Sequence, residues 1–210
     1  MKICEIFHSI QGEGVFIGTP TVFVRTSGCN LNCAWCDTRY AGEGGTDMTV
    51  DEIVREVRKY PVDNVCITGG EPLIQDNIGT LIRRLLNRTY YVTIETNGSI
   101  GIRNLARMHR LMLSMDIKCP SSGMHEKMLL NEIKYMNDTD QLKFVIADEA
   151  DYNYASEIIS KYRPRCHKIF QPCWGTDIRW LAEKTLADGL DVRVLPQLHK
   201  LIWGPDERGR

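Results

Sequence analysis

The sequence lacks any segment that could cross a membrane, because none of its apolar runs approaches the ~20 residues that a membrane-spanning helix needs. It also lacks internal repeats, low-complexity segments and linkers that would mark a second domain. Its first residues mix charged and apolar side chains and show no cleavable signal pattern. We therefore expect one domain over residues 1–210, located in the cytoplasm and without a membrane partner.

A strong excess of either charge is missing as well. The net charge of −1 gives no indication of a surface for nucleic acid, so we expect no such partner. The eight cysteines do not indicate a disulfide framework, because a cytosolic chain of this size keeps its thiols reduced. Five lie singly, mostly in or beside apolar runs, and we interpret them as buried small hydrophobic residues: Cys4, Cys66, Cys119, Cys166 and Cys173.

The other three cysteines, Cys29, Cys33 and Cys36, are separated by three and then two residues. This spacing lets three thiolates on one loop converge on a metal centre. A structural zinc ion normally takes four protein ligands, whereas an iron–sulfur cubane held by three thiolates keeps one iron open to a small molecule. Since the loop holds no fourth cysteine, the pattern favours an open cluster. A zinc site completed by Cys4 or His8 is the alternative.

Short β-branched runs alternate with amphipathic stretches along the chain, which predicts a parallel sheet with helices outside it. The expected strands cover residues 21–25, 65–68, 90–96, 111–118, 142–146, 168–172 and 192–195, after a short first strand. The expected helices cover residues 49–59, 77–87, 103–109, 126–135, 154–162 and 177–187. Polar residues and glycines follow or end many of these strands, at the edge where parallel barrels build their sites.

Two glycine-containing motifs are candidates for ligand contacts. Gly69-Gly70-Glu71-Pro72 is on its own a turn, but its glycines would let the backbone approach a ligand closely, and Glu71 would offer a carboxylate. Beside an open iron, this edge would suit the ammonium and carboxylate of an amino acid. Gln11-Gly12-Glu13-Gly14 is either a simple loop or an amide and a carboxylate that recognise the donor edge of a purine-like or pterin-like ring.

Three single residues have two interpretations each. Arg25 is either an ordinary strand-end arginine or a planar fork for a substrate carboxylate. The default interpretation of Thr38 is a turn hydroxyl, and its alternative is a weak magnesium ligand that needs substrate oxygens and water beside it. His199 taken alone is more often a satisfied polar residue than a site residue.

The cysteine spacing together with the Gly-Gly-Glu-Pro turn resembles the radical S-adenosylmethionine superfamily, and within it the 7-carboxy-7-deazaguanine synthase family. The resemblance extends over nearly the whole chain, in residues 9–16, 21–37, 68–72, 95–98, 116–123, 170–172 and 195–200. It implies a partial, curtailed TIM-like barrel of about six parallel strands with outer helices. It also implies a homodimer and an external electron donor of the flavodoxin or ferredoxin type.

The same resemblance implies the chemistry. A [4Fe–4S] cluster would bind S-adenosylmethionine and cleave it reductively to a 5′-deoxyadenosyl radical. In this family the radical abstracts hydrogen from 6-carboxy-5,6,7,8-tetrahydropterin. A Mg²⁺-assisted ring contraction with loss of ammonia then gives 7-carboxy-7-deazaguanine, a precursor of queuosine and archaeosine. The radical recovers its hydrogen, so S-adenosylmethionine acts as a reusable cofactor.

Residue roles follow from the resemblance at matching positions. The substrate would contact Ile10, Gln11, Gly12, Glu13, Arg25, Thr68 and His199. The cluster would be held by Cys29, Cys33 and Cys36, and Thr38 would ligate Mg²⁺. S-adenosylmethionine would contact Trp35, Asp37, Gly70, Asp116, Ile117, Lys118 and Gln171.

Two other functions are consistent with parts of the pattern. An activase of the same superfamily, which places a glycyl radical on a partner enzyme, would share the cysteines and the Gly-Gly-Glu-Pro turn. It would not use Gln11–Gly14 and Gln197–Lys200 as pterin contacts, and it would consume S-adenosylmethionine. A non-catalytic zinc or iron–sulfur module is the second alternative, and metal and sulfide analysis would distinguish it.

Overall fold

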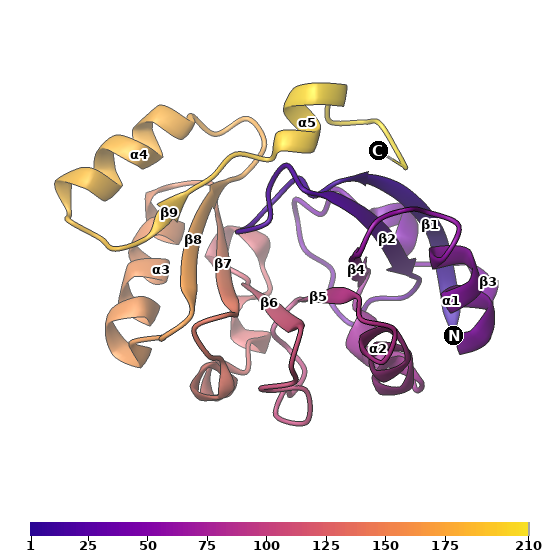
Figure 1. The fold of residues 1–210 in the computed structure, drawn as a ribbon. Coiled ribbons are helices and arrows are strands. Elements are labelled where there is room, and N and C mark those ends of the chain that lie inside the picture. The colour runs from indigo at the N-terminus through magenta and orange to yellow at the C-terminus, as the bar shows by residue number, and fades with distance from the viewer. Residues whose placement is uncertain (210) are drawn as a thin grey trace.

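The computed structural model describes residues 1–209 and contains one curved sheet of nine strands in the order β3-β1-β2-β4-β5-β6-β7-β8-β9 (Figure 1). Seven strands are parallel to one another: β2 (Pro20–Thr26), β4 (Asn64–Gly69), β5 (Tyr91–Thr96), β6 (Leu111–Ile117), β7 (Gln141–Ile146), β8 (His167–Pro172) and β9 (Arg193–Val194). β1 (Lys2–Ile10) is antiparallel to β2 and to β3 (Thr46–Asp47). This confirms the predicted sheet, although the sequence pattern did not indicate the antiparallel edge.

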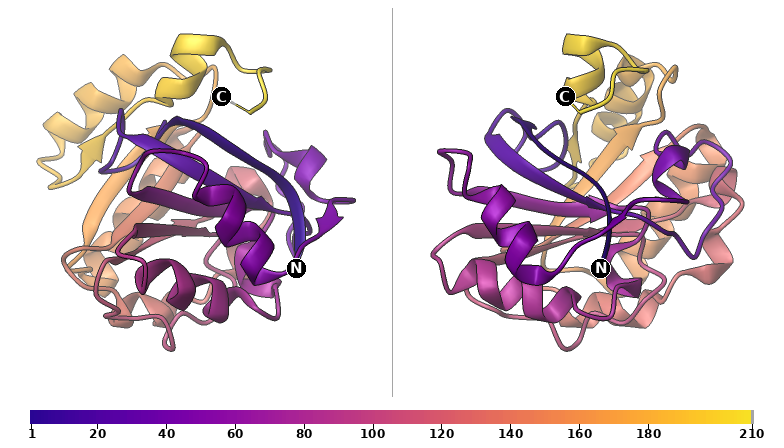
Figure 2. Two further views of the ribbon diagram at one scale, coloured as in Figure 1. Left: turned by 45° about the vertical axis from the view of Figure 1, so that its right-hand side comes forward. Right: turned by 90° about the vertical axis from the view of Figure 1, so that its right-hand side faces the viewer.

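Four helices lie on the outer side of the sheet, and Figure 2 shows how the strands curve inside them. These helices are α1 (Val50–Val57), α2 (Ile78–Leu86), α3 (Glu149–Tyr162) and α4 (Ile178–Ala187). α5 (Leu198–Trp203) lies instead beside the loop after β1, where Leu198 N donates to Gly12 O over 2.9 Å (Figure 1). In residues 1–209, no helix has both the length and the apolar character needed to span a membrane.

Local sequence signals explain why two of these helices form where they do. α1 begins at a capping box, in which Thr49 and Glu52 satisfy each other's backbone N–H groups. α2 buries Ile78, Leu81 and Leu85 on one face, as the apolar spacing of its sequence predicts.

Two predicted helices are wrong. Residues 103–109 form turns, and Arg107 has a φ of +64°, a left-handed conformation that ends any right-handed helix. Residues 126–135 form two short 3₁₀ segments, His125–Lys127 and Leu130–Tyr135. Buried Ile133 packs against the core within the second of these segments.

The alternation along each strand separates an apolar outer face from a polar inner face. In β5, Val92 and Ile94 pack in the core under the helices, whereas Glu95 faces the inside of the curved sheet. In β7, Phe144 lies in the core and Lys143 faces inward. The stability of the fold therefore comes from the outer layer, and the inner face is left for a ligand.

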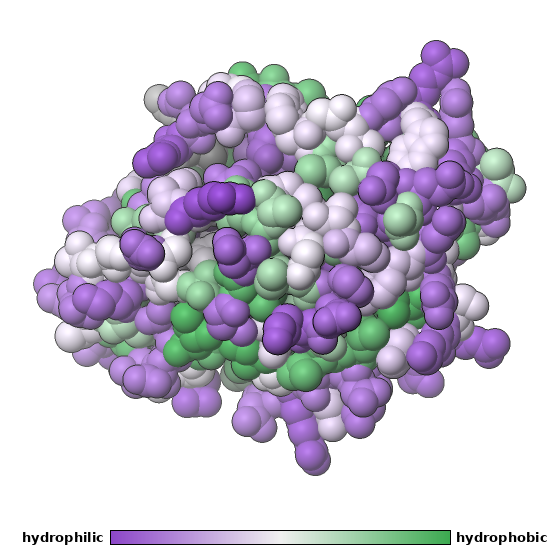
Figure 3. Space-filling model, turned by 180° about the vertical axis from the view of Figure 1, so that it is seen from behind, coloured by the Kyte–Doolittle hydropathy of each residue, from purple (hydrophilic) through white to green (hydrophobic). Residues whose placement is uncertain are grey.

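The five single cysteines follow their prediction in part. Cys66, Cys119 and Cys166 are buried, as expected, whereas Cys4 and Cys173 are only partly buried. The rear surface in Figure 3 is largely hydrophilic with an apolar area in its lower half.

Candidate functional site

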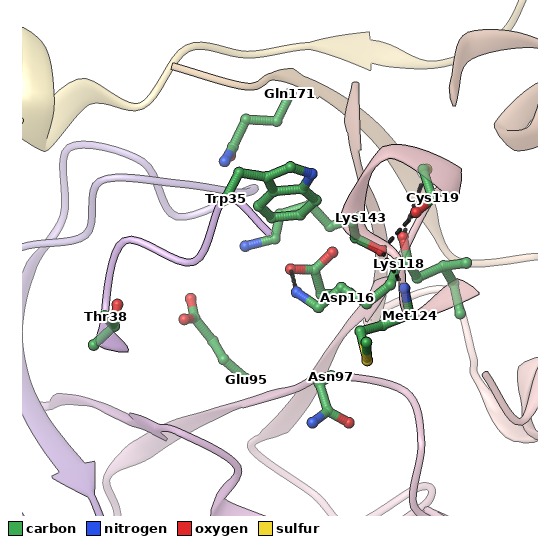
Figure 4. Close-up of polar contacts among 12 residues, drawn as sticks. Trp35, Thr38, Glu95, Asn97, Asp116, Lys118, Cys119, Met124, Lys143 and Gln171 are labelled. Atoms are coloured by element: carbon green, nitrogen blue, oxygen red, sulfur yellow. Dashed lines mark hydrogen bonds and ion pairs between the residues drawn. The ribbon is translucent and has the colours of Figure 1, made fainter. Parts of the chain in front are cut away.

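A cavity of about 1260 Å³ opens at the carboxyl end of the parallel strands. The strand register sets Arg25 beside Thr68 and Asp116 beside Lys143, and Figure 4 shows Asp116, Lys143 and Gln171 directed toward one space. All but one of the residues whose ligand contacts the resemblance implies line this cavity: Ile10, Gln11, Gly12, Glu13, Arg25, Cys29, Cys33, Trp35, Cys36, Asp37, Thr38, Thr68, Gly70, Asp116, Lys118, Gln171 and His199.

Ile117 is the exception, because its side chain is fully buried in the core and faces away from the cavity. Only its backbone remains for a contact with a ligand. Glu71 likewise does not offer its carboxylate to the cavity. It accepts hydrogen bonds from Thr96 Oγ1 at 2.9 Å, Asn97 N at 2.6 Å and Leu73 N at 3.0 Å, and its exposure is 0%. Glu71 therefore joins the ends of β4 and β5, and burial raises its pKa.

The three closely spaced cysteines lie on the loop after β2 and all face the cavity. Cys33 is buried, while Cys29 and Cys36 are exposed. Across residues 1–209, no three His, Cys, Asp or Glu side chains are grouped as ligands for one metal ion. In a [4Fe–4S] cluster each thiolate binds a different iron, so three thiols that face one cavity suit such a cluster.

A zinc site completed by a residue near the N-terminus is not favoured by this geometry. Cys4 and His8 are not among the described residues that line the cavity. The His8 ring packs against Tyr60 instead, with ring centroids 5.5 Å apart.

The Gly-Gly-Glu-Pro turn packs directly on the cysteine loop, where Glu71 N donates to Gly28 O over 2.8 Å. A Cβ atom at Gly70 would lie 2.1 Å from Gly28 O and 2.9 Å from the Cβ of Cys29. Only glycine permits this approach, so the turn places bare backbone next to the first cysteine. The contact of this edge with a ligand's ammonium and carboxylate stays a prediction.

Asp116 and Lys118 form an ion pair of 2.7 Å below Trp35, whose ring centroid lies 5.3 Å from Lys118 Nζ (Figure 4). Two oxygen atoms of the cavity, Asp116 Oδ1 and Gln171 Oε1, are buried without a hydrogen-bond partner among the described residues. A buried acceptor without a hydrogen bond lowers the stability of the fold unless a ligand supplies the donor. Both residues line the cavity, and each leaves one side-chain oxygen without a donor among the described residues.

Glu13 organises the other side of the cavity. Its carboxylate accepts hydrogen bonds from Lys143, from Gln171 Nε2 at 3.0 Å and from Gln197 Nε2 at 2.8 Å. Burial is the largest influence on Glu13 and opposes its ionisation, but the charge of Lys143 together with the other donors around the carboxylate outweighs this cost and lowers the pKa of Glu13. Burial likewise opposes the charge of Lys143, and the carboxylates around it, Glu13 first, together outweigh burial and raise the pKa of the amine. Glu13 is therefore a fixed anion with donors on several sides.

Gln11–Gly14 is held in place by two distant segments. Val15 N donates to Gln141 Oε1 over 2.9 Å, and a Cβ at Gly14 would lie 2.4 Å from the Gln141 amide. A Cβ at Gly12 would lie 2.1 Å from His199 Nδ1. The loop and the start of α5 thus close one wall of the cavity together.

Arg25 is 16% exposed and lies in the cavity rather than extending to solvent. Its Nε donates to Glu5 over 2.7 Å, and Tyr40 donates to the same carboxylate over 2.9 Å. Glu5 therefore fixes the guanidinium through one edge, so that its terminal nitrogens are oriented for a second anion.

Thr38 does not cap the backbone of the 3₁₀ turn Arg39–Ala41 that follows it. Its hydroxyl donates instead to Asp37 Oδ1 over 2.9 Å. Asp37 also pairs with Lys200 Nζ at 2.6 Å. Two oxygen side chains thus meet at the cavity edge, but a magnesium ion would need further ligands from substrate and water.

Lys143 lines the cavity but was missed by the sequence analysis, whereas Glu95, Asn97, Gln197 and Lys200 lie in the recognised motifs without having been given individual roles. Glu95 accepts from Thr68 Oγ1 over 3.1 Å, and Asn97 Nδ2 lies 3.8 Å from Cys29 Sγ. Lys143 carried a usable signal, because a lysine inside an otherwise apolar strand points to a polar inner face.

Comparison with known proteins agrees with this geometry. Residues 23–143 match the radical SAM superfamily. The 7-carboxy-7-deazaguanine synthase of Thermoplasma acidophilum is 42% identical over 97% of this chain and 98% of its own length. That of Chlorobaculum tepidum is 43% identical over 100% of this chain and 97% of its own. The chain belongs to the 7-carboxy-7-deazaguanine synthase family.

Two solved structures share the fold of this chain. The crystal structure of QueE from Escherichia coli has a TM-score of 0.77 at 24% identity, covering 94% of each chain. Streptococcus suis SuiB, solved bound to S-adenosylmethionine, has a TM-score of 0.59 at 14% identity over 80% of this chain. The curtailed barrel expected from the sequence is thereby confirmed.

Proposed function

We propose that this cavity converts 6-carboxy-5,6,7,8-tetrahydropterin to 7-carboxy-7-deazaguanine with loss of ammonia, for the synthesis of queuosine or archaeosine. The observation that supports this most is the meeting of two wall segments over one space. The cysteine loop with bare Gly70 forms one side, and Gln11–Glu13 with His199 forms the other. A radical made on the first side would be confined next to a substrate held on the second.

The cluster side of the cavity is assigned to cofactor binding. Cys29, Cys33 and Cys36 would hold a [4Fe–4S] cluster. When bound, the cluster and S-adenosylmethionine supply a 5′-deoxyadenosyl radical. Gly70 offers backbone to the methionyl group. Trp35, Asp37, Asp116, Ile117 through its backbone, Lys118 and Gln171 would enclose the rest of the nucleotide.

The opposite side is assigned to the pterin. The fixed anion of Glu13 would accept N–H groups from the pterin ring, flanked by Ile10, Gln11 and Gly12. Arg25 would take the substrate carboxylate, with Thr68 and His199 on the remaining polar edges. Burial lowers the pKa of His199, so its ring is a neutral hydrogen-bonding group at neutral pH.

Ring contraction requires a group that moves protons as ammonia leaves. Glu95 is the carboxylate placed for this, because it reaches the cavity from the end of β5 and is oriented by the Thr68 hydroxyl at 3.1 Å. We assign Mg²⁺ to Thr38 together with the substrate carboxylate and water, at the cavity edge where Asp37 also lies.

The glycyl-radical activase is disfavoured by one contact. That function does not need Gln11–Gly14 and Gln197–Lys200 as a substrate wall, yet Leu198 N bonds Gly12 O over 2.9 Å and closes these two segments around the cavity. We further propose one domain over the whole chain, a cytoplasmic homodimer, and reduction by a flavodoxin or ferredoxin. The exposed thiols Cys29 and Cys36 support the last point, since they bring the cluster near the surface.

The test is anaerobic turnover of the reduced, cluster-loaded enzyme with the tetrahydropterin and Mg²⁺. Mass spectrometry is expected to identify 7-carboxy-7-deazaguanine while the amount of S-adenosylmethionine stays constant. Consumption of one S-adenosylmethionine per product would refute cofactor recycling. Protein that carries one zinc and no sulfide would support the non-catalytic module instead.

A further inference from the structure

A short turn after β6, Pro120–Ser122, is built onto the start of α3 by a buried carboxylate. Asp151 lies in the first turn of α3 and has 0% exposure. Its Oδ1 accepts from Ser121 N at 2.9 Å, and its Oδ2 accepts from Ala147 N at 2.9 Å and from the Ser121 hydroxyl. Three donors therefore converge on one carboxylate, which fixes the turn independently of any ligand.

The same turn holds the cysteine loop through two hydrogen bonds. Trp35 Nε1 donates to Ser121 Oγ over 3.0 Å, and Ala34 N donates to Ser122 O over 3.0 Å. Both donors lie between Cys33 and Cys36 in the sequence. A continuous path thus runs from α3 through the turn to the middle of the cysteine loop.

The polarity of this path depends on Asp151. A hydroxyl can donate one hydrogen bond and accept others, and a carboxylate can only accept. Because the Ser121 hydroxyl gives its proton to Asp151, its lone pairs are left to face the Trp35 N–H. This fixes the direction of the indole, whose ring centroid lies 5.3 Å from Lys118 Nζ.

We propose that Ser121 and Asp151 are positioning residues for S-adenosylmethionine, acting through the orientation of Trp35. Neither residue lines the cavity, so their effect passes through the indole and not through direct contact. The inference rests on the proposed function, because it takes Trp35 as a contact of the nucleotide.

The primary experiment measures S-adenosylmethionine binding by calorimetry to the cluster-loaded, unreduced enzyme under anaerobic conditions. Ser121→Ala is expected to weaken binding about fivefold, the effect of losing one hydrogen bond. Ser121→Thr retains the hydroxyl and is expected to restore affinity. The KM of the pterin and the iron and sulfide content are expected to stay unchanged in both variants.

The matched control is Ser156→Ala, which removes a hydroxyl that donates to Tyr152 O on the same helix, 2.8 Å away. This variant is expected to bind S-adenosylmethionine like the wild type. A general loosening of α3 would lower affinity in Ser156→Ala too, and that result would overturn the proposal.

A double-mutant cycle tests the route through the indole. Trp35→Phe removes the donor and leaves the contact between Ser121 and Asp151 in place. In the Trp35→Phe background, Ser121→Ala is expected to have no further effect on the affinity for S-adenosylmethionine. Additive losses of affinity in the double variant would contradict the proposal. In ¹⁵N-tryptophan-labelled protein, the indole resonance that Trp35→Phe deletes is expected to shift in Ser121→Ala and to stay in Ser121→Thr. This readout does not depend on affinity or turnover.

The outcomes distinguish a failure of the proposed function from a failure of the positioning role alone. A wild-type enzyme that does not bind S-adenosylmethionine overturns the proposed function and this inference with it. A wild type that binds while Ser121→Ala binds equally well overturns the positioning role alone.

Discussion

Lys200 Nζ lies 2.6 Å from a carboxylate oxygen of Asp37, which ties α5 to the residue directly after the last cysteine of the loop. Lys200 is 7% exposed and Asp37 is 46% exposed. Burial opposes the ionisation of Asp37, but the charge of Lys200 together with the hydrogen bonds from Lys200 and Thr38 outweighs burial, so the pKa of Asp37 is lowered. The segment that carries His199 is therefore fastened to the cofactor side of the cavity as well as to Gly12.

Lys200→Met is expected to loosen this connection. Because one partner is half exposed, the loss of stability should stay at about 1 kcal/mol or below. We expect higher KM values for both S-adenosylmethionine and pterin, and faster chymotrypsin cleavage near α5. The control is Lys168→Met, whose partner Asp191 is 99% exposed and lies outside the cavity lining. Equal effects of the two substitutions on KM would remove any role for the Lys200 pair.

Gly70→Ala is expected to disrupt the cofactor side of the cavity. The new methyl group would meet backbone, Gly28 O at 2.1 Å, so the cysteine loop or the turn must move. We expect iron and sulfide content after reconstitution to fall, and any S-adenosylmethionine binding to be lost.

Gly79→Ala in α2 is the matched control, since its added methyl would find its nearest neighbour at 3.7 Å. Removing glycine from a helix is expected to stabilise the protein, by up to about 1 kcal/mol. A Gly70→Ala enzyme with full iron content and normal binding would contradict the close approach described for this turn.

Thr38→Ala tests the magnesium assignment. We expect the Mg²⁺ concentration for half-maximal activity to rise while the cluster absorbance is unchanged. Thr38→Ser keeps the hydroxyl and is expected to respond like the wild type. An unaltered Mg²⁺ response in Thr38→Ala would exclude Thr38 from the metal site.

His199 gives the fold a pH dependence with a definite sign. Burial lowers its pKa below the ordinary 6.5, although Glu13 acts in the opposite direction. The unfolded chain therefore takes up a proton first, so this contribution to stability is complete above pH 6.5 and is lost as the pH falls through that value.

His199→Gln is expected to reduce the loss of stability between about pH 7.5 and about pH 5.5, measured as the shift in urea midpoint. His167→Gln, outside the cavity lining, measures the effect of losing a histidine elsewhere in the fold. A pH dependence that is identical in wild type and His199→Gln would show that His199 is not held neutral by burial.

Much of this architecture could be predicted because the strands and most helices carry strong local periodicity. The position of the site could also be predicted, since motifs at successive strand ends must meet at one rim of a parallel sheet. The prediction that Glu71 offers its carboxylate to a ligand was wrong, because the sequence does not show that Thr96 and Asn97 donate hydrogen bonds to it. Pairings between distant segments, such as Glu13 with Lys143, depend on tertiary register and have no local signal.

The sheet is open, and its two borders differ in length. At one border β9 consists of the two residues Arg193–Val194, whereas at the other border β3 (Thr46–Asp47) pairs only with Lys2 and Ile3. Residues 4–10 of β1 therefore have no neighbouring strand on that side among the described residues. An edge of this length can pair with an added strand, so two copies of this chain could associate through β1 without any change to the cavity.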